Sequence, residues 1–126
     1  MLRLLIASTF VAVLTMSAGG AAGQASTQVS GEAVYRRACA SCHSIEAGVN
    51  RSGPSLAGIS DRAAGAVRQF RYSDAMSSSP VVWTDVQLDA FLTNPRGAMP
   101  GNRMAYPGLA GPEDRAAVIR YLRTLR

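Results

Sequence analysis

Residues 39–43 read Cys39-Ala40-Ser41-Cys42-His43, and they are the most informative segment of the chain. The pattern Cys-x-x-Cys-His is the signature of c-type haem attachment. Two thiols one helical turn apart can add to the two vinyl groups on one edge of the porphyrin, and the next residue then turns its imidazole onto the iron. The sequence therefore predicts one covalently attached haem c, bound through Cys39 and Cys42, with His43 as an axial ligand of the iron.

Three other uses of a Cys-x-x-Cys pair compete with haem attachment. A thioredoxin-like redox motif is the strongest of them, but that fold needs strands alternating with helices around the motif, and no such pattern is present. A structural disulfide gives His43 no role. A zinc site needs further Cys or His ligands that the chain does not contain.

The first 23 residues have the features of a secretory signal peptide. Arg3 supplies a short basic region, residues 4–16 are mostly apolar, and small residues end in Ala21-x-Gly23. This predicts cleavage before Gln24, with Ala22 and Ala25 as alternative ends. An uncleaved membrane anchor is the rival interpretation, but crossing a bilayer takes about 20 apolar residues. We expect an exported, periplasmic protein with residues 24–126 as one domain and no stable membrane insertion after cleavage.

Residues 24–126 show helical periods and no strand pattern, which predicts an all-α fold. Three main helices are expected: one from an N-cap at Ser30, one from Thr84 to Asn94, and one from Pro112 toward the C-terminus. About forty residues rich in Gly, Ser and Pro (44–82) separate the first two helices, a length that is unusual for a structureless loop. Three short helices also bury little apolar surface. A large flat cofactor at the centre resolves both difficulties.

The second axial ligand has few candidates. His43 is the only histidine, so the chain cannot supply two histidine ligands. The methionines after the signal peptide are Met76, Met99 and Met104, and a His/Met pair is common in electron-transfer haems. Met99 and Met104 share one Pro/Gly-rich loop, and spacing alone does not choose between them.

A series of motifs in the same order resembles class I cytochrome c, the bacterial cytochrome c2 and mitochondrial cytochrome c type. The likeness runs from about Gly31 to Leu125. Gly53-Pro54-Ser55-Leu56 resembles the family's Gly-Pro-x-Leu, which implies that the carbonyl of Pro54 orients His43. Pro100-Gly101-x-x-Met104 resembles the family's axial-methionine loop, which implies that Met104 is the second axial ligand of the iron. The resemblance also implies contacts with the haem propionates from Arg62, from the Phe70-Arg71-Tyr72-Ser73 segment (through Tyr72) and from Trp83.

The same resemblance predicts how the first and last helices cross, and it also shows three departures. Gly31 and Tyr35 match positions that meet the last helix near Val118 and Tyr121, with the glycine permitting close approach. The departures are Phe91 in place of a tyrosine that bonds the methionine sulfur, Asn102 in place of a hydroxyl residue near a propionate, and Met76 in place of a buried asparagine. None of them removes an expected iron ligand.

The function implied is one-electron transfer without catalysis, because two axial side chains leave no open coordination position. We expect a monomeric carrier that shuttles between a quinol-cytochrome c reductase and an oxidase or photosynthetic reaction centre. A dedicated cytochrome subunit or acceptor of a periplasmic dehydrogenase is the alternative, and a haem-free thiol oxidoreductase is the third hypothesis.

The charge pattern predicts how such partners are recognised. All 13 basic residues are arginine, so the chain has no lysine to act as a general base, to form a Schiff base or to bind phosphate in a loop. The formal net charge is +5. Five arginines are expected to steer partners with acidic docking surfaces, with a generally solvated basic surface as the simpler interpretation; they are Arg36, Arg37, Arg51, Arg96 and Arg103. We expect no nucleic-acid binding, since no binding motif accompanies the charge.

Overall fold

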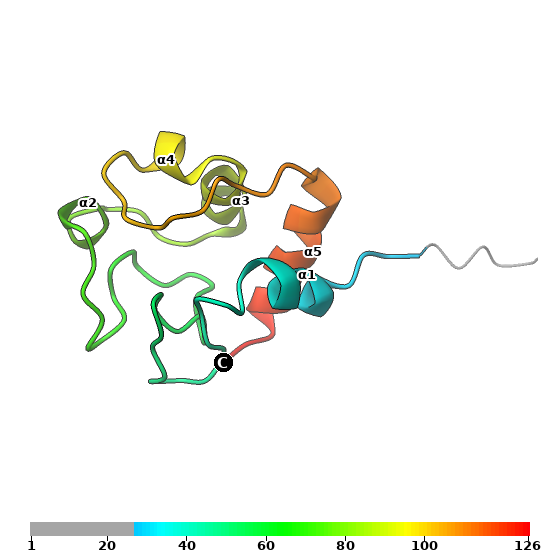
Figure 1. The fold of residues 1–126 in the computed structure, drawn as a ribbon, viewed down its shortest axis with the longest axis horizontal. Helices are drawn as coiled ribbons and strands as arrows, with labels where there is room; N and C mark the ends of the chain where they lie inside the picture. Colours follow the sequence, from blue (N-terminus) through cyan, green and yellow to red (C-terminus); the bar gives the residue numbers. More distant parts are fainter. Residues whose placement is uncertain (1–26) are drawn as a thin grey trace, which may run out of the picture.

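The computed structural model describes residues 27–126, and within this range the fold is helical, as predicted (Figure 1). The expected signal peptide and its cleavage site lie outside the described residues. The extended segments of the described range meet at one isolated bridge, between Ala63 and Val82. The helices in chain order are α1 (Gly31–Ala38), α2 (Asp74–Ser77), α3 (Asp85–Thr93), α4 (Pro95–Ala98) and α5 (Pro112–Arg123).

The three long helices begin where their capping residues predict. The Ser30 hydroxyl accepts from the Ala33 amide at 3.3 Å, and the Thr84 hydroxyl accepts from the Gln87 amide at 3.3 Å. Each bond satisfies one of the amides that a helix N-terminus leaves without an intrahelical acceptor. α5 starts with Pro112 in its first turn, where the missing N–H costs nothing.

Two short helices, α2 and α4, were not predicted. Each has four residues, which is too few for a hydrophobic period to be visible in the sequence. Both have side-chain caps: the Ser73 hydroxyl accepts from the Met76 amide, and Asn94 Oδ1 accepts from the Gly97 amide. α2 lies within the expected 44–82 loop, so part of that long connection has regular structure.

α1 and α5 cross at one end of the molecule (Figure 1), and Gly31 sets how closely they approach. A Cβ at Gly31 would lie 2.1 Å from the carbonyl oxygen of Ala117 and 2.6 Å from Cβ of Tyr121. Only a residue without a side chain fits there. The rings of Tyr35 and Tyr121 then pack with centroids 5.8 Å apart. The predicted crossing is confirmed.

Ion pairs tie α5 to its two neighbouring helices. Arg115 Nε lies 2.7 Å from Asp89 Oδ1, and Arg123 Nε lies 2.6 Å from Asp85 Oδ1, both across the α3–α5 contact. On the other side, Arg37 of α1 pairs with Asp114 of α5. The Arg37–Asp114 and Arg123–Asp85 pairs are partly exposed, so each contributes at most about 1 kcal/mol. The Arg115 side chain is only 12% exposed, so water screens its pair with Asp89 less.

Polar side chains hold the loop that follows the attachment motif. The buried Ser55 hydroxyl donates to the Glu46 carbonyl at 2.6 Å, and Asn50 Oδ1 accepts from the Ser55 amide at 2.9 Å. The far end of this loop lies beside the C-terminus (Figure 1), where the Gly58 amide donates to the Leu125 carbonyl at 3.1 Å. The loop is therefore ordered by its own hydrogen bonds, although it contains little regular structure.

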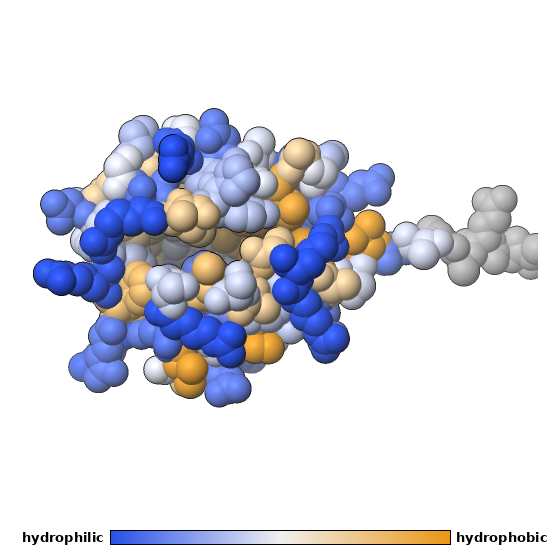
Figure 2. Space-filling view, in the orientation of Figure 1, coloured by the Kyte–Doolittle hydropathy of each residue, from blue (hydrophilic) through white to orange (hydrophobic). Residues whose placement is uncertain are grey.

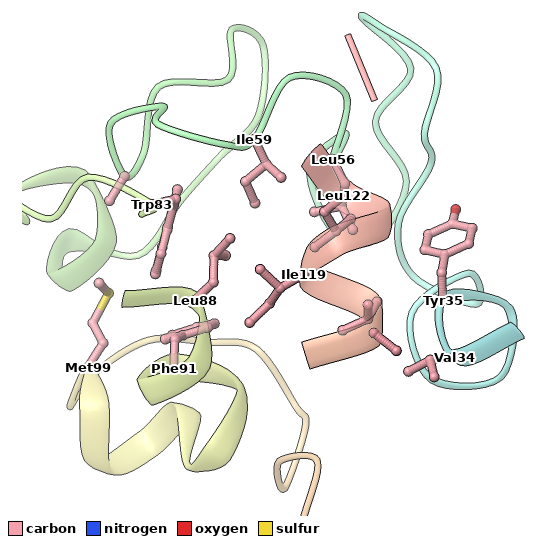
Figure 3. Close-up of a cluster of buried hydrophobic side chains, with 13 residues drawn as sticks. Val34, Tyr35, Leu56, Ile59, Trp83, Leu88, Phe91, Met99, Ile119 and Leu122 are labelled. Atoms are coloured by element: carbon pink, nitrogen blue, oxygen red, sulfur yellow. The ribbon is translucent and has the colours of Figure 1, made fainter. Parts of the chain in front are cut away.

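The buried apolar side chains come from α1, from the loop after it, from α3 and α5, and from Trp83 and Met99 beside these helices (Figure 3). Several of them also line a cavity: Leu56, Ile59, Trp83, Leu88, Phe91, Val118 and Leu122. The side chains alone leave this space open. The structure thus contains a cavity where the predicted cofactor would complete the core.

Candidate functional site

The attachment motif forms a tight turn at the C-terminal end of α1. The Cys39 carbonyl accepts from the amides of Cys42 and His43, at 3.1 and 2.9 Å. This turn brings both thiols and the imidazole to one cavity wall. The thiols are free, and their environments differ: burial raises the pKa of Cys39 to about 11, whereas bonds with the Ser52 and Ser41 hydroxyls lower the pKa of the exposed Cys42.

His43 is held in one orientation by the loop that faces it. Its Nδ1 lies 2.7 Å from the carbonyl oxygen of Pro54, so Nδ1 carries the proton and donates it to that carbonyl. Burial lowers the pKa of His43, which favours the neutral ring. In this tautomer Nε2 keeps its lone pair, as a metal ligand requires. The expected contact between Pro54 and His43 is present.

Gly53 leaves the space that the imidazole occupies. A Cβ at this position would lie 2.4 Å from Cε1 and 2.6 Å from Nδ1 of His43. No side chain fits between the loop backbone and the ring. Gly53 therefore leaves space for the imidazole ring, and Pro54 supplies the carbonyl that accepts its hydrogen bond.

The motif opens into a cavity of about 480 Å³ that reaches the molecular surface. Figure 2 shows the hollow across the middle of one face, with hydrophilic side chains around its rim. Its walls are mainly apolar and come from segments far apart in the chain, including Leu88 and Phe91 of α3 and Val118 and Leu122 of α5. A cavity of this size with few polar groups is typical of a cofactor site.

The methionines differ in their relation to the cavity. Met76 and Met104 both line it. Met99 is 7% exposed and lies in the hydrophobic cluster with Trp83 and Phe91 (Figure 3). The geometry therefore separates two methionines that the sequence spacing left equivalent.

Arg62, Tyr72 and Trp83, the residues expected near the propionates, all line the cavity, and both Tyr72 and Trp83 lie near Arg62. Arg62 donates from Nη1 to the Ala57 carbonyl at 2.7 Å and from Nη2 to the Ser55 carbonyl at 3.1 Å. Its buried Nε–H has no acceptor in the described part of the chain, and none of the ion pairs found there includes Arg62. A half-buried cation with a buried donor that has no partner suits an anionic group of a ligand.

Tyr72 and Trp83 border this arginine. The Tyr72 hydroxyl accepts from the Val67 amide at 3.3 Å, which leaves its own proton available for a further acceptor. Burial raises the pKa of Tyr72, so the hydroxyl stays protonated. Trp83 is 6% exposed and joins the segment of Arg62 through its amide, which donates to the Arg62 carbonyl at 2.9 Å.

The five arginines expected at the surface are all exposed, but their neighbours differ. Arg36 pairs with Glu32 and Arg37 pairs with Asp114, so acidic groups offset both charges. Arg51 donates to the Ala40 carbonyl. Of the five, Arg103 alone is part of the lining of the large cavity, while Arg96 borders a separate shallow pocket beside Tyr106.

Sequence reasoning missed Tyr106 at this site, and it named Arg71 and Asn102 without identifying their contacts. Arg71 is exposed and lines the cavity, and its carbonyl accepts from Arg103 at 2.7 Å. Tyr106 also lines the cavity, and burial raises its pKa. Asn102 makes three hydrogen bonds in the loop before Met104. The polar loop composition could have suggested a role for Asn102, but only folding reveals its partners.

The residues at this site fit a covalent haem c. The donor set is two free thiols, one neutral imidazole with an available lone pair and a thioether, and the walls between them are apolar. The unsatisfied Arg62 Nε suits a propionate. Residues 27–126 contain no cluster of three His, Cys, Asp or Glu side chains that suits a separate metal ion. None of the helices in this range has the length and apolar character to cross a bilayer.

Comparisons with known proteins show the family of this chain. The family model described as Cytochrome c matches residues 28–126. A cytochrome c2 iso-2 of Magnetospirillum fulvum is 47% identical over 87 residues, which are 69% of this chain and 91% of that protein. A cytochrome c of Euglena viridis is 38% identical over 96 residues, covering 76% and 94% of the two chains. The solved structure of cytochrome cH from Methylobacterium extorquens has a TM-score of 0.69 at 32% identity and covers 75% of this chain and 94% of that one.

Proposed function

Since the chain belongs to the cytochrome c family, we propose that it is a periplasmic one-electron carrier whose haem iron is ligated by His43 and Met104. Proteins of this family carry one covalently attached haem c and exchange electrons with redox partners. The bound haem supplies an iron ion that gains and loses one electron. The proposal adds the ligand residues, the compartment and the way partners are recognised.

The observation that carries the proposal is the shared cavity of the attachment turn and Met104. Cys39 and Cys42 are the two points of thioether attachment. His43 presents Nε2 while Pro54 holds Nδ1, an arrangement that also raises the basicity of the imidazole. Met99 is packed in the core, which leaves Met76 and Met104 at the cavity. The resemblance of Pro100-Gly101-x-x-Met104 to the family's axial-methionine loop then favours Met104 as the sulfur ligand.

Two axial side chains explain why we propose electron transfer and no catalysis. With His43 and Met104 on the iron, no coordination position is left for a substrate. With haem bound, the apolar walls would keep water from the iron, so a change of charge there would meet little solvent reorganisation. Arg62 and Tyr72 have donors that would bind the haem propionates and offset their negative charge.

We propose that the carrier diffuses freely and docks through the open side of the cavity. Arg71 and Arg103 are exposed residues of the lining and present positive charge there. Acidic surfaces are the matching chemistry, as on a quinol-cytochrome c reductase and on an oxidase or reaction centre. Arginine also pairs with carboxylates bidentately, which adds orientation to the attraction.

The ligand assignment is tested by mass spectrometry and substitution. The denatured protein should have the mass of the polypeptide after signal cleavage plus one haem; the mass of the polypeptide alone would disprove the proposal. In Met104→Ala the weak absorption band of the iron–sulfur bond should vanish, while Met99→Ala and Met76→Ala should keep it. Loss of the band in Met76→Ala or Met99→Ala, with Met104→Ala unaffected, would reassign the ligand.

The carrier role is tested by the salt dependence of electron exchange. Rates with an acidic partner should fall steeply between low and physiological ionic strength, because screening over about 10 Å at 0.1 M shortens the reach of steering. A salt-insensitive rate, together with co-purification of a periplasmic dehydrogenase, would favour the dedicated-subunit alternative over the free carrier.

A further inference from the structure

Asn102 connects the loop that carries Met104 to the α4 region. Its Nδ2 donates to the carbonyls of Pro95 at 2.8 Å and Met99 at 2.7 Å, and its Oδ1 accepts from the Met104 amide at 3.0 Å. The amide orientation is fixed by these neighbours, because a flipped group would set its oxygen against two carbonyls. One side chain thus joins three backbone groups within ten residues.

The two carbonyls belong to a part of the chain that is anchored in the core. Pro95 is among the most completely buried side chains, and Met99 is 7% exposed in the hydrophobic cluster. The Met99 amide donates to the Pro95 carbonyl at 3.0 Å, and the Asn102 amide donates to the Met99 carbonyl at 3.2 Å. Asn102 therefore donates its two hydrogen bonds to a segment that is fixed by its packing in the core.

The third bond acts directly on the backbone of Met104. An Asn side chain that accepts from the amide two residues later forms an Asx turn, which fixes the direction of the chain. The Met104 carbonyl also accepts from the Tyr106 amide at 2.9 Å. Both sides of the Met104 peptide unit are thus held while its side chain lines the cavity.

We propose that Asn102 is the positioning residue that keeps the Met104 sulfur at the iron. The inference rests on the proposed function, since it takes Met104 as the ligand. Asn102 stabilises the closed loop, in which Met104 occupies the axial position, over an open loop in which another ligand can enter. A ligand that binds only the open state has an apparent affinity proportional to the population of that state.

The test is a titration of the ferric holo-protein with imidazole, followed by loss of the iron–sulfur band. Asn102→Ala removes all three bonds, so the open state becomes more populated and imidazole should bind at least about tenfold more tightly, which corresponds to about 1.4 kcal/mol. Asn102→Ser keeps a weaker bond to the Met104 amide and loses the reach to Pro95 and Met99. Its affinity for imidazole should lie between those of the wild type and Asn102→Ala.

Asn50→Ala is the matched control. Asn50 is similarly half-buried and also bridges backbone groups, accepting from Ser55 at 2.9 Å and donating to Arg68 at 3.2 Å, but on the side of His43. The Asn50→Ala variant should unfold at a lower denaturant concentration than the wild type, and its affinity for imidazole should stay within twofold of the wild-type affinity. An equal gain in imidazole affinity in Asn50→Ala would reduce the role of Asn102 to general stability and overturn the inference.

The inference and the proposed function fail in different ways. If Met104→Ala loses the iron–sulfur band but both Asn102 variants bind imidazole as the wild type does, the positioning role is wrong and the ligand assignment stands. If Met104→Ala keeps the band, the ligand assignment itself is wrong. Should Asn102→Ala yield no holo-protein, Asn102→Ser decides, and wild-type affinity in that variant overturns the inference.

Discussion

Gly53→Ala should disturb His43, the proposed iron ligand, more than it disturbs the fold around it. The new Cβ would lie 2.4 Å from His43 Cε1, whereas carbon atoms in contact prefer about 3.5 Å or more, so the ring or the loop must move by about 1 Å. The Nδ1 to Pro54 hydrogen bond is 2.7 Å long, and a displacement of that size takes it beyond hydrogen-bonding distance.

The magnitude follows from two costs. Inserting a methyl group into a filled space costs about 1–3 kcal/mol, and losing a hydrogen bond costs about 1 kcal/mol more. We expect the free energy of unfolding of the ferric holo-protein to fall by about 2–4 kcal/mol in guanidinium denaturation. The midpoint potential should rise, because the bond to Pro54 increases the basicity of the imidazole and so favours ferric iron.

Gly58→Ala separates this effect from backbone strain. Gly58 has φ of +61°, and a Cβ there meets nothing within 4 Å, so the substitution costs roughly 1–2 kcal/mol through the backbone alone. It should leave the potential and the low-temperature EPR spectrum of the ferric protein unchanged. A Gly53→Ala protein with wild-type potential, EPR spectrum and unfolding free energy would refute the steric argument.

Three further predictions concern the helix crossing, the missing lysines and the surface charge. Gly31→Ala should lower the free energy of unfolding by about 1–3 kcal/mol, because its Cβ would meet the Ala117 carbonyl oxygen at 2.1 Å; wild-type stability in denaturant titration would contradict the predicted clash. With no lysine in the chain, and arginine always protonated, any alkaline ferric form should be hydroxide-ligated or high-spin, and an amine-type low-spin EPR signal from protein with a blocked N-terminus would show otherwise. Arg103→Glu should slow association with an acidic partner more than Arg120→Glu, since Arg103 lines the cavity and Arg120 is exposed on α5 away from that lining; equal effects in stopped-flow measurements would indicate net charge alone.

The sequence by itself determined the cofactor chemistry and the positions of the long helices. Cys39, Cys42 and His43 lie within five consecutive residues, so one local turn brings them together. Ser30 and Thr84 mark helix starts through bonds to amides three residues away, which are also local. Interactions of this range can be predicted from a short stretch of chain.

The short helices and the polar contacts of the loops could not be predicted in this way. α2 and α4 have four residues each, and their formation depends on caps and on packing against other segments. Asn102 was identified only as a departure from a family pattern. Its partners Pro95 and Met99 precede it by seven and three residues, and it reaches both only because α4 turns the chain back on itself.

The tertiary structure alone decided which side chains share the cavity. Met76 and Met104 line it, although they are far apart in the chain, while Met99 is buried in the core only five residues before Met104. The buried Nε of Arg62 has no hydrogen-bond partner in the described part of the chain, although the two Nη atoms donate to the carbonyls of Ser55 and Ala57. The sequence specifies local bonds and residue chemistry, but burial and contact depend on how distant segments pack, and that packing places Met76 and Met104 at the cavity and Met99 in the core.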